Sequence, residues 1–140
     1  MRQSAVVALL SVAGIAACSG DNKPPPLRQI SLSYSYEVAP DVSPPRAREP
    51  IAYKINIIDR KTRQPIENGE GRIFASDSAG AKTWDGFRYG PEIGTYHGVL
   101  NFITPGQWAL AIQFRRDSLH PLERIDWRQD VHNEKPSAVP

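Results

Sequence analysis

The chain has almost no sulfur, since Cys18 is its single cysteine and Met1 its single methionine. A lone cysteine cannot pair within the chain, so we expect no internal disulfide and a core that is held by packing alone. Charge of one sign is also lacking, because basic and acidic residues are interspersed and the net charge is only +2 over 140 residues. No basic block points to nucleic acid, and no acidic tail points to a solvating role.

The sequence also lacks an apolar run that is long enough to span a bilayer stably. Its one candidate, residues 5–17 (AVVALLSVAGIAA), follows a positive charge at Arg2 and ends in small residues, which is typical of a secretory signal. The end of the run, Ile15-Ala16-Ala17-Cys18, resembles the lipobox of bacterial lipoproteins. The resemblance implies that Cys18 is lipidated and becomes the first residue of the mature chain. The alternative is an ordinary signal peptide that ends by chance in a cysteine.

These features divide the chain into four predicted segments. Residues 1–17 form the signal peptide, 18–27 the lipidated cysteine and a Pro-rich tether, 28–132 one folded domain, and 133–140 a disordered tail. Ser19 follows the cysteine in place of the Asp that marks inner-membrane retention in enterobacterial lipoproteins. We therefore expect a lipid-anchored envelope protein, on the outer membrane and facing the periplasm if the source is Gram-negative.

Apolar residues that alternate with polar ones predict the strands of the domain. We expect a first strand over residues 28–38, others over 51–58 and 72–76, a hairpin at Asp85-Gly86, and a last strand over 122–131. Residues 94–116 predict a further hairpin around a Pro-Gly turn, with two apolar faces: Tyr96, Leu100 and Phe102, then Trp108, Leu110, Ile112 and Phe114. Seven or eight short strands, thirteen prolines and no convincing helix predict an all-β sandwich.

Three motifs in the middle of the chain carry a family resemblance: Asp59-Arg60-Lys61-Thr62-Arg63-Gln64-Pro65-Ile66, Gly94-Thr95-Tyr96, and Pro105-Gly106-Gln107-Trp108-Ala109-Leu110. Together they resemble the YtkA-like and FixH-like domains of bacterial lipoproteins and membrane proteins. The resemblance covers residues 51–116 and implies an immunoglobulin-like sandwich, with links to copper handling or oxidase assembly in some members. The chain departs from the pattern at two places. Arg63 replaces the usual Gly, and residues 75–90 contain no Met or His.

Four aromatic residues are the candidate surface for a partner or ligand: Trp84, Phe87, Tyr89 and Tyr96. In one interpretation they form an exposed platform for a partner or a sugar. In the other, Trp84 and Tyr96 belong to the core and a single aromatic is exposed, which is the interpretation we favour. Trp108 and Trp127 are in phase with the apolar faces of their strands, so we assign both to the core.

Catalytic and metal-binding patterns are weak. The histidines His97, His120 and His132 are dispersed and the mature chain offers no free sulfur, so we expect no metal site and no cofactor. Asp117, Ser118 and His120 are neighbours in sequence without a nucleophile elbow, so we expect no enzyme.

Two functional hypotheses remain. The first is a lipid-anchored module for protein–protein interaction, or an accessory subunit of an envelope complex, with the membrane and an envelope protein as partners. The alternative is a periplasmic module that binds a ligand or handles metal, as the family resemblance implies. No nucleic acid and no small-molecule substrate is expected in the first hypothesis.

Overall fold

The computed structural model describes residues 23–136. The predicted signal peptide, Cys18 and the last residues of the predicted tail lie outside the described residues. Within the described range, no helix is long and apolar enough to cross a membrane.

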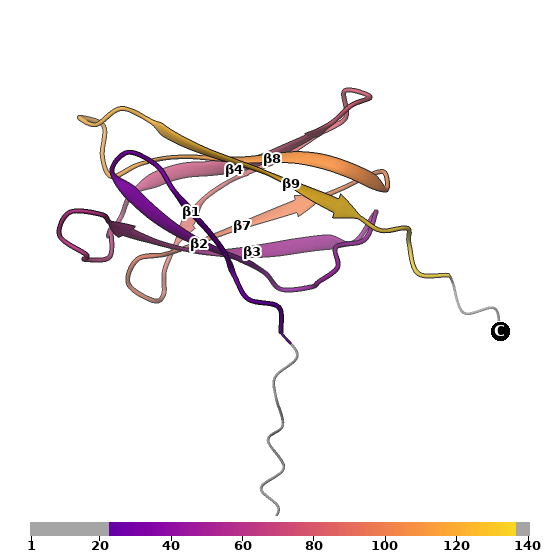
Figure 1. The fold of residues 1–140 in the computed structure, drawn as a ribbon, viewed down its shortest axis with the longest axis horizontal. Coiled ribbons are helices and arrows are strands. Elements are labelled where there is room, and N and C mark those ends of the chain that lie inside the picture. Colours follow the sequence, from indigo (N-terminus) through magenta and orange to yellow (C-terminus); the bar gives the residue numbers. More distant parts are fainter. Residues whose placement is uncertain (1–22, 137–140) are drawn as a thin grey trace, which may run out of the picture.

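Within residues 23–136, nine strands form two antiparallel sheets that pack face to face (Figure 1). One sheet has the order β1-β2-β3-β7-β6 and the other the order β5-β4-β8-β9, which is the Greek-key arrangement of an immunoglobulin-like sandwich. The predicted all-β sandwich is therefore confirmed, with nine strands in place of seven or eight. The strands are β1 (Leu27–Ile30), β2 (Tyr34–Pro40), β3 (Pro50–Asp59), β4 (Glu70–Asp77), β5 (Lys82–Gly86), β6 (Arg88–Tyr89), β7 (Thr95–Asn101), β8 (Gly106–Arg115) and β9 (Glu123–Val131).

The inward faces of the long strands follow the alternation in the sequence. On β3 the inward-facing apolar residues are Ile51, Tyr53, Ile55 and Ile57, and on β8 they are Trp108, Leu110, Ile112 and Phe114. Because successive side chains of a strand point to opposite faces, each strand gives one apolar surface to the space between the sheets. Both strands contribute the apolar residues of their alternation to the core, and on β8 these are the four residues that the sequence assigned to the buried face.

An aromatic cluster fills the centre of this core. Phe114 of β8 packs edge-on against Tyr34 and Tyr96 of the opposite sheet, with ring centroids 5.0 and 5.1 Å apart. The Tyr96 hydroxyl donates to the Ile66 carbonyl at 2.6 Å and accepts from the Gly69 amide at 2.9 Å. Burial raises the pKa of Tyr96 to about 12, so the hydroxyl stays protonated and the segment that follows the β3–β4 turn stays attached to the core.

The predicted hairpin over residues 94–116 is wrong. Its two strands carry the predicted buried faces, but β7 pairs with β3 while β8 pairs with β4 and β9, so they belong to different sheets. Residues 102–105 carry the chain across the core, where Phe102 and Trp108 pack edge-on with centroids 5.1 Å apart. Gly106 holds a φ of +118°, a conformation that glycine adopts readily. Alternation identifies the buried side of a strand, but it does not show which strand pairs with it.

The single first strand predicted over residues 28–38 is also wrong, because it is a hairpin of β1 and β2. The turn between them contains Leu32, which is 85% exposed, and Ile30 points outward and is 61% exposed. Two distant residues hold the turn. Glu123 accepts from the Ser33 amide at 2.7 Å, and Arg60 donates to the Leu32 carbonyl at 3.1 Å. These long-range contacts interrupt an alternation that looks continuous in the sequence.

The hairpin predicted at Asp85-Gly86 does not form, because β5 pairs with β4 and β6 pairs with β7 of the other sheet. The Asp85 carboxylate accepts from the Val99 amide of β7 at 2.8 Å and pairs with Arg88 at 3.1 Å. These contacts hold the chain where it passes from the four-stranded sheet to the five-stranded sheet at the edge of the sandwich. The separate β6 that results, together with the split first strand, explains why more strands form than the sequence predicted.

The ends of the domain differ slightly from the predicted limits. Leu27, placed in the tether, opens β1 and packs against the core. Beyond β9, the Asn133 carbonyl accepts from Arg46 at 3.0 Å and Glu134 pairs with Arg48 at 3.0 Å. The first residues of the predicted tail therefore contact the loop between β2 and β3.

A charged pair joins the two sheets at one end of the sandwich. Asp59, which ends β3, accepts from the amides of Thr62 at 2.9 Å and Lys61 at 2.7 Å, and is ion-paired with Arg116 just after β8. The hydrogen bond from Thr62, with those from Lys61 and Arg116, lowers the pKa of the Asp59 carboxyl. The carboxylate therefore stabilises both the β3–β4 turn and the contact between the sheets.

We expect Trp108→Ala to bring the domain close to unfolding at growth temperature. Trp108 is fully buried, and removal of a buried aromatic costs about 3–5 kcal/mol of a total stability of about 5–15 kcal/mol. Gln107→Ala, one residue away on the exposed face, should cost well under about 1 kcal/mol. Urea melts of the two variants measure the difference, and equal shifts of the midpoint would contradict the assigned register.

Acid should weaken the fold through Asp59. Because its pKa is lowered in the folded state, its contribution is complete above the unfolded-state pKa of about 4 and is lost as the pH falls from there through the lower folded-state pKa. Asp59→Asn should reduce stability at pH 7 and make the dependence on pH shallower. Asp130→Asn, an exposed change on β9, is the matched control. Urea midpoints across this range test the assignment, and an unchanged slope in Asp59→Asn would refute it.

Candidate functional site

The structure separates the four aromatics of the predicted surface. Tyr96 is fully buried, and Phe87 and Tyr89 are half-buried beside it, with ring centroids 5.8 and 5.1 Å from its ring. Trp84, by contrast, is 67% exposed on the outer side of β5. The expectation that Tyr96 is a core residue is correct, and the same expectation for Trp84 is wrong. A single platform of four aromatics does not form.

Trp84 lies on an outer sheet face that combines aromatic and basic side chains. Its cross-strand neighbour on β4 is Phe74, and the guanidinium groups of Arg72 and Arg124 lie 5.0 and 5.1 Å from the centroid of the Phe74 ring. We call this surface the Trp84 face and define it by Arg72, Phe74, Trp84, Gln113 and Arg124. Cations outnumber carboxylates on this side of the sheet. The cations are Lys82, Arg72, Arg115, Arg124 and Arg128, and the carboxylates are Glu70, Asp126 and Asp130.

A shallow hollow of about 330 Å³ lies beside Trp84. Its polar wall is ordered by two contacts: Arg72 Nε donates to Gln113 Oε1 at 3.0 Å, and Arg115 Nε to Glu70 Oε1 at 2.9 Å. The lining also includes the exposed apolar side chains of Trp84 and Leu122. Arg115 is neutralised by the carboxylate of Glu70, whereas Arg72 donates to a neutral amide and lies over the Phe74 ring.

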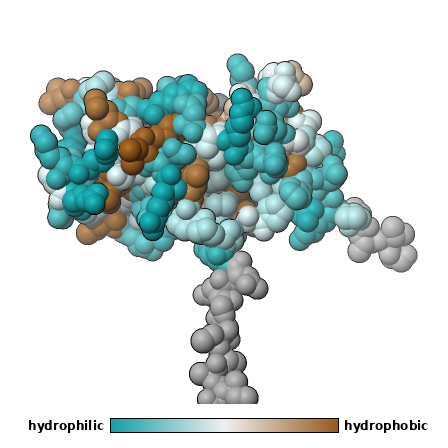
Figure 2. Space-filling model, in the orientation of Figure 1, coloured by the Kyte–Doolittle hydropathy of each residue, from teal (hydrophilic) through white to brown (hydrophobic). Residues whose placement is uncertain are grey.

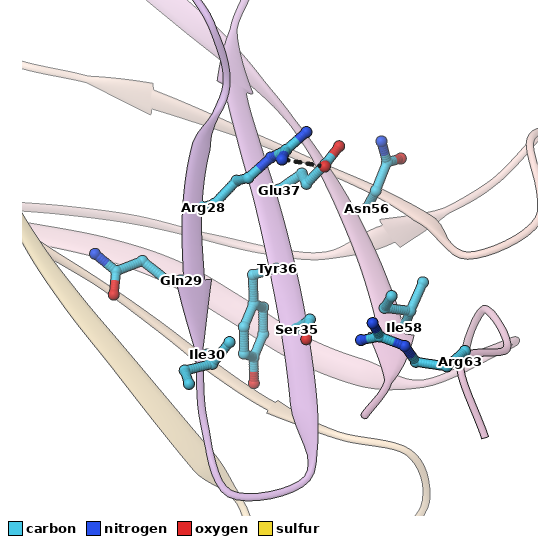
Figure 3. Close-up of a pocket in the computed structure, with 9 residues that line it drawn as sticks. All are labelled: Arg28, Gln29, Ile30, Ser35, Tyr36, Glu37, Asn56, Ile58 and Arg63. Atoms are coloured by element: carbon cyan, nitrogen blue, oxygen red, sulfur yellow. Dashed lines mark ion pairs between the residues drawn. The ribbon is translucent and has the colours of Figure 1, made fainter. Parts of the chain in front are cut away.

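A larger hollow of about 540 Å³ lies on the outer face of the other sheet, over β1, β2 and β3 (Figure 3). Two cross-strand rows form its floor. Ile30, Ser35 and Ile58 are register neighbours in one row, and Arg28, Glu37 and Asn56 are register neighbours in the next. Figure 3 shows the ion pair of Arg28 and Glu37 at one end, with Nε and Oε1 3.1 Å apart.

Arg63 reaches into this hollow from the turn after β3. Its side chain points toward Ile58 and Ser35 (Figure 3), and its backbone has a φ of +63°, which L-residues seldom adopt. The sequence shows that an arginine occupies a position where the turn usually has glycine, but it does not show why. The hollow also depends on the outward position of Ile30.

The histidines do not converge. His97 lies on the outer side of β7, His120 contacts Asp117 with Nδ1 and Oδ1 2.7 Å apart in an exposed loop, and His132 bridges to Arg46 after β9. Ser118 is exposed in the same loop as His120. Within residues 23–136, no group of three or more His, Cys, Asp or Glu residues is placed to hold a metal ion.

Comparison with known proteins identifies one similar fold. The chain resembles the crystal structure of a DUF4426 family protein from Pseudomonas aeruginosa PAO1, with a TM-score of 0.60 and 11% sequence identity. The match covers 79% of this chain and 97% of the other. No protein-family model and no curated protein matches the sequence. At this identity the likeness concerns the fold alone.

Proposed function

We propose that this chain is a lipid-anchored β-sandwich of the bacterial envelope that docks on an envelope protein through the Trp84 face. The observation that carries the proposal is the exposure of Trp84 beside the Arg72, Phe74 and Arg124 stack. Tryptophan and arginine dominate the residues that contribute most to protein interfaces. Solvent contact with most of a large indole is unfavourable, so burial of Trp84 against a partner would contribute to binding.

The charge of the Trp84 face indicates the chemistry of the partner. Arg72 has no carboxylate partner among residues 23–136, and Arg124 is paired with Asp126 at 2.7 Å. A protein surface with an apolar side chain next to acidic residues would complement both the indole and the unpaired guanidinium. Such complementarity steers association and suppresses wrong partners.

The position of the tether also supports docking through the Trp84 face. Lys23 and the prolines 24–26 lie over the outer side of the five-stranded sheet, near Glu37 and Lys54. Trp84 belongs to the other sheet and faces the opposite way. A domain that is anchored through Cys18 would therefore present the Trp84 face away from its own tether.

Cys18→Ser should release the protein from membranes or stall its precursor, because serine cannot form the thioether to a lipid. Ser19→Ala, which keeps the cysteine, should leave membrane association unchanged. Detergent partitioning of the two variants is the measurement. If Cys18→Ser partitions like the wild type, the lipid anchor is disproved.

Trp84→Ala should weaken the envelope complex by at least about tenfold, as expected for a residue that dominates an interface. The free energy of unfolding of the Trp84→Ala domain should differ from that of the wild type by less than about 0.5 kcal/mol, because the side chain is mostly exposed. The measurement is affinity purification of tagged full-length protein from membranes, with quantification of co-purified protein.

Two further variants make this experiment specific. Arg72→Glu reverses the unpaired charge and should weaken the same complex. Leu119→Ala removes an apolar side chain that is even more exposed, in the β8–β9 loop, and should have no effect. Equal recovery of the partner by the wild type and Trp84→Ala would exclude the Trp84 face as the docking surface.

A further inference from the structure

We infer that the hollow on the outer face of β1, β2 and β3 binds a small amphipathic monocarboxylate, with Arg63 holding its anionic end. This inference concerns the opposite face of the sandwich from Trp84. It does not depend on the proposed docking surface, and it can fail or succeed without it.

The floor of the hollow has the shape of an apolar trough. Ile30, Ser35 and Ile58 lie side by side on three adjacent strands, so a small residue stands between two large apolar ones. Adjacent strands are about 4.8 Å apart, which places the two isoleucine strands about 10 Å from one another. An extended aliphatic chain of about eight carbons matches this span. The apolar character continues past Ile30 to the exposed Leu32. Figure 2 shows apolar atoms among polar ones on the left side of the molecule, where the hairpin of β1 and β2 lies in Figure 1.

The polar groups around the trough leave one cation unmatched. Arg28 is neutralised by Glu37 in the second row. Asn56 Oδ1 accepts from the Thr95 hydroxyl at 2.9 Å, so the nitrogen of that amide remains as a donor. Among the described residues, the guanidinium of Arg63 has no hydrogen-bond or ion-pair partner. The hollow therefore offers donors and an uncompensated positive charge, which select an anion.

A carboxylate fits this arrangement better than a phosphate. One guanidinium carries one charge and can hold both oxygens of a carboxylate through two parallel hydrogen bonds. A phosphate monoester carries about two charges at neutral pH and would need a second free cation. Arg28 cannot supply that charge without breaking its pair with Glu37. The volume of about 540 Å³ lies within the range of small-molecule sites.

The backbone of Arg63 gives independent support. A φ of +63° strains an arginine but not a glycine, and Asp59 and Thr62 already form the turn without help from the Arg63 side chain. Strained residues of this kind concentrate at ligand-binding positions. An arginine here puts its guanidinium over the trough, which glycine could not do.

The test measures binding of radiolabelled octanoate to the full-length chain in lipid nanodiscs by equilibrium dialysis. Empty nanodiscs correct for partition of the probe into lipid. Wild-type protein should bind octanoate saturably with one site per chain, and Arg63→Gly should weaken binding by at least about tenfold through loss of a charge-assisted pair. Octylammonium, which has the same tail and the opposite charge, should not bind to the wild type.

The matched control is Asn68→Gly, which also replaces an exposed residue of positive φ in the β3–β4 connection but does not line the hollow. It should leave octanoate binding unchanged. The thermal midpoint of Arg63→Gly should not fall, because glycine relaxes the backbone, so lost binding cannot be attributed to unfolding. Equal octanoate binding by the wild type and Arg63→Gly, equal binding of octanoate and octylammonium, or no saturation up to about 10 mM would each overturn the proposal.

Discussion

The contact between the two sheets around Phe114 and Tyr96 is the constraint on which this molecule depends. No disulfide can reinforce it, because the one cysteine precedes the domain. The Tyr96 hydroxyl extends the contact to Ile66 and Gly69, and the pair of Asp59 with Arg116 closes one end. Because these interactions use only inward-facing side chains and one end of the sandwich, both outer sheet faces stay available for other roles.

The two outer faces differ in chemistry because different strands compose them. The four-stranded sheet presents Trp84 with a cationic and aromatic stack, which suits a flat protein surface. The five-stranded sheet carries the tether on one part and an apolar trough under Arg63 on another, which suits a small ligand. In the account proposed above, one domain holds a partner on one side and binds a small molecule on the other. Both roles would operate close to the membrane if Cys18 carries lipid.

The alternation of apolar and polar residues was sufficient to predict the fold class and the inner faces of β3 and β8, because it follows directly from strand geometry. It was insufficient for pairing, since β7 and β8 look like a hairpin but cross between sheets. It also failed where distant side chains decide the local structure, as Glu123 and Arg60 do at the turn before β2. The same limit applies to the candidate site at Arg63. The sequence shows that an arginine replaces the usual glycine of the turn, but the trough beside it forms only when three strands are paired.

The central claim is that the Trp84 face meets a partner in the envelope, and photocrosslinking in living cells tests it most directly. A photoreactive amino acid would be placed at Lys82, an exposed position two residues from Trp84, or at Val99, which is exposed on the outer face of the other sheet. The account predicts one discrete protein adduct from position 82, no such adduct from position 99, and loss of the adduct when Trp84→Ala is added. The same adduct from both positions, or its persistence without Trp84, would contradict it.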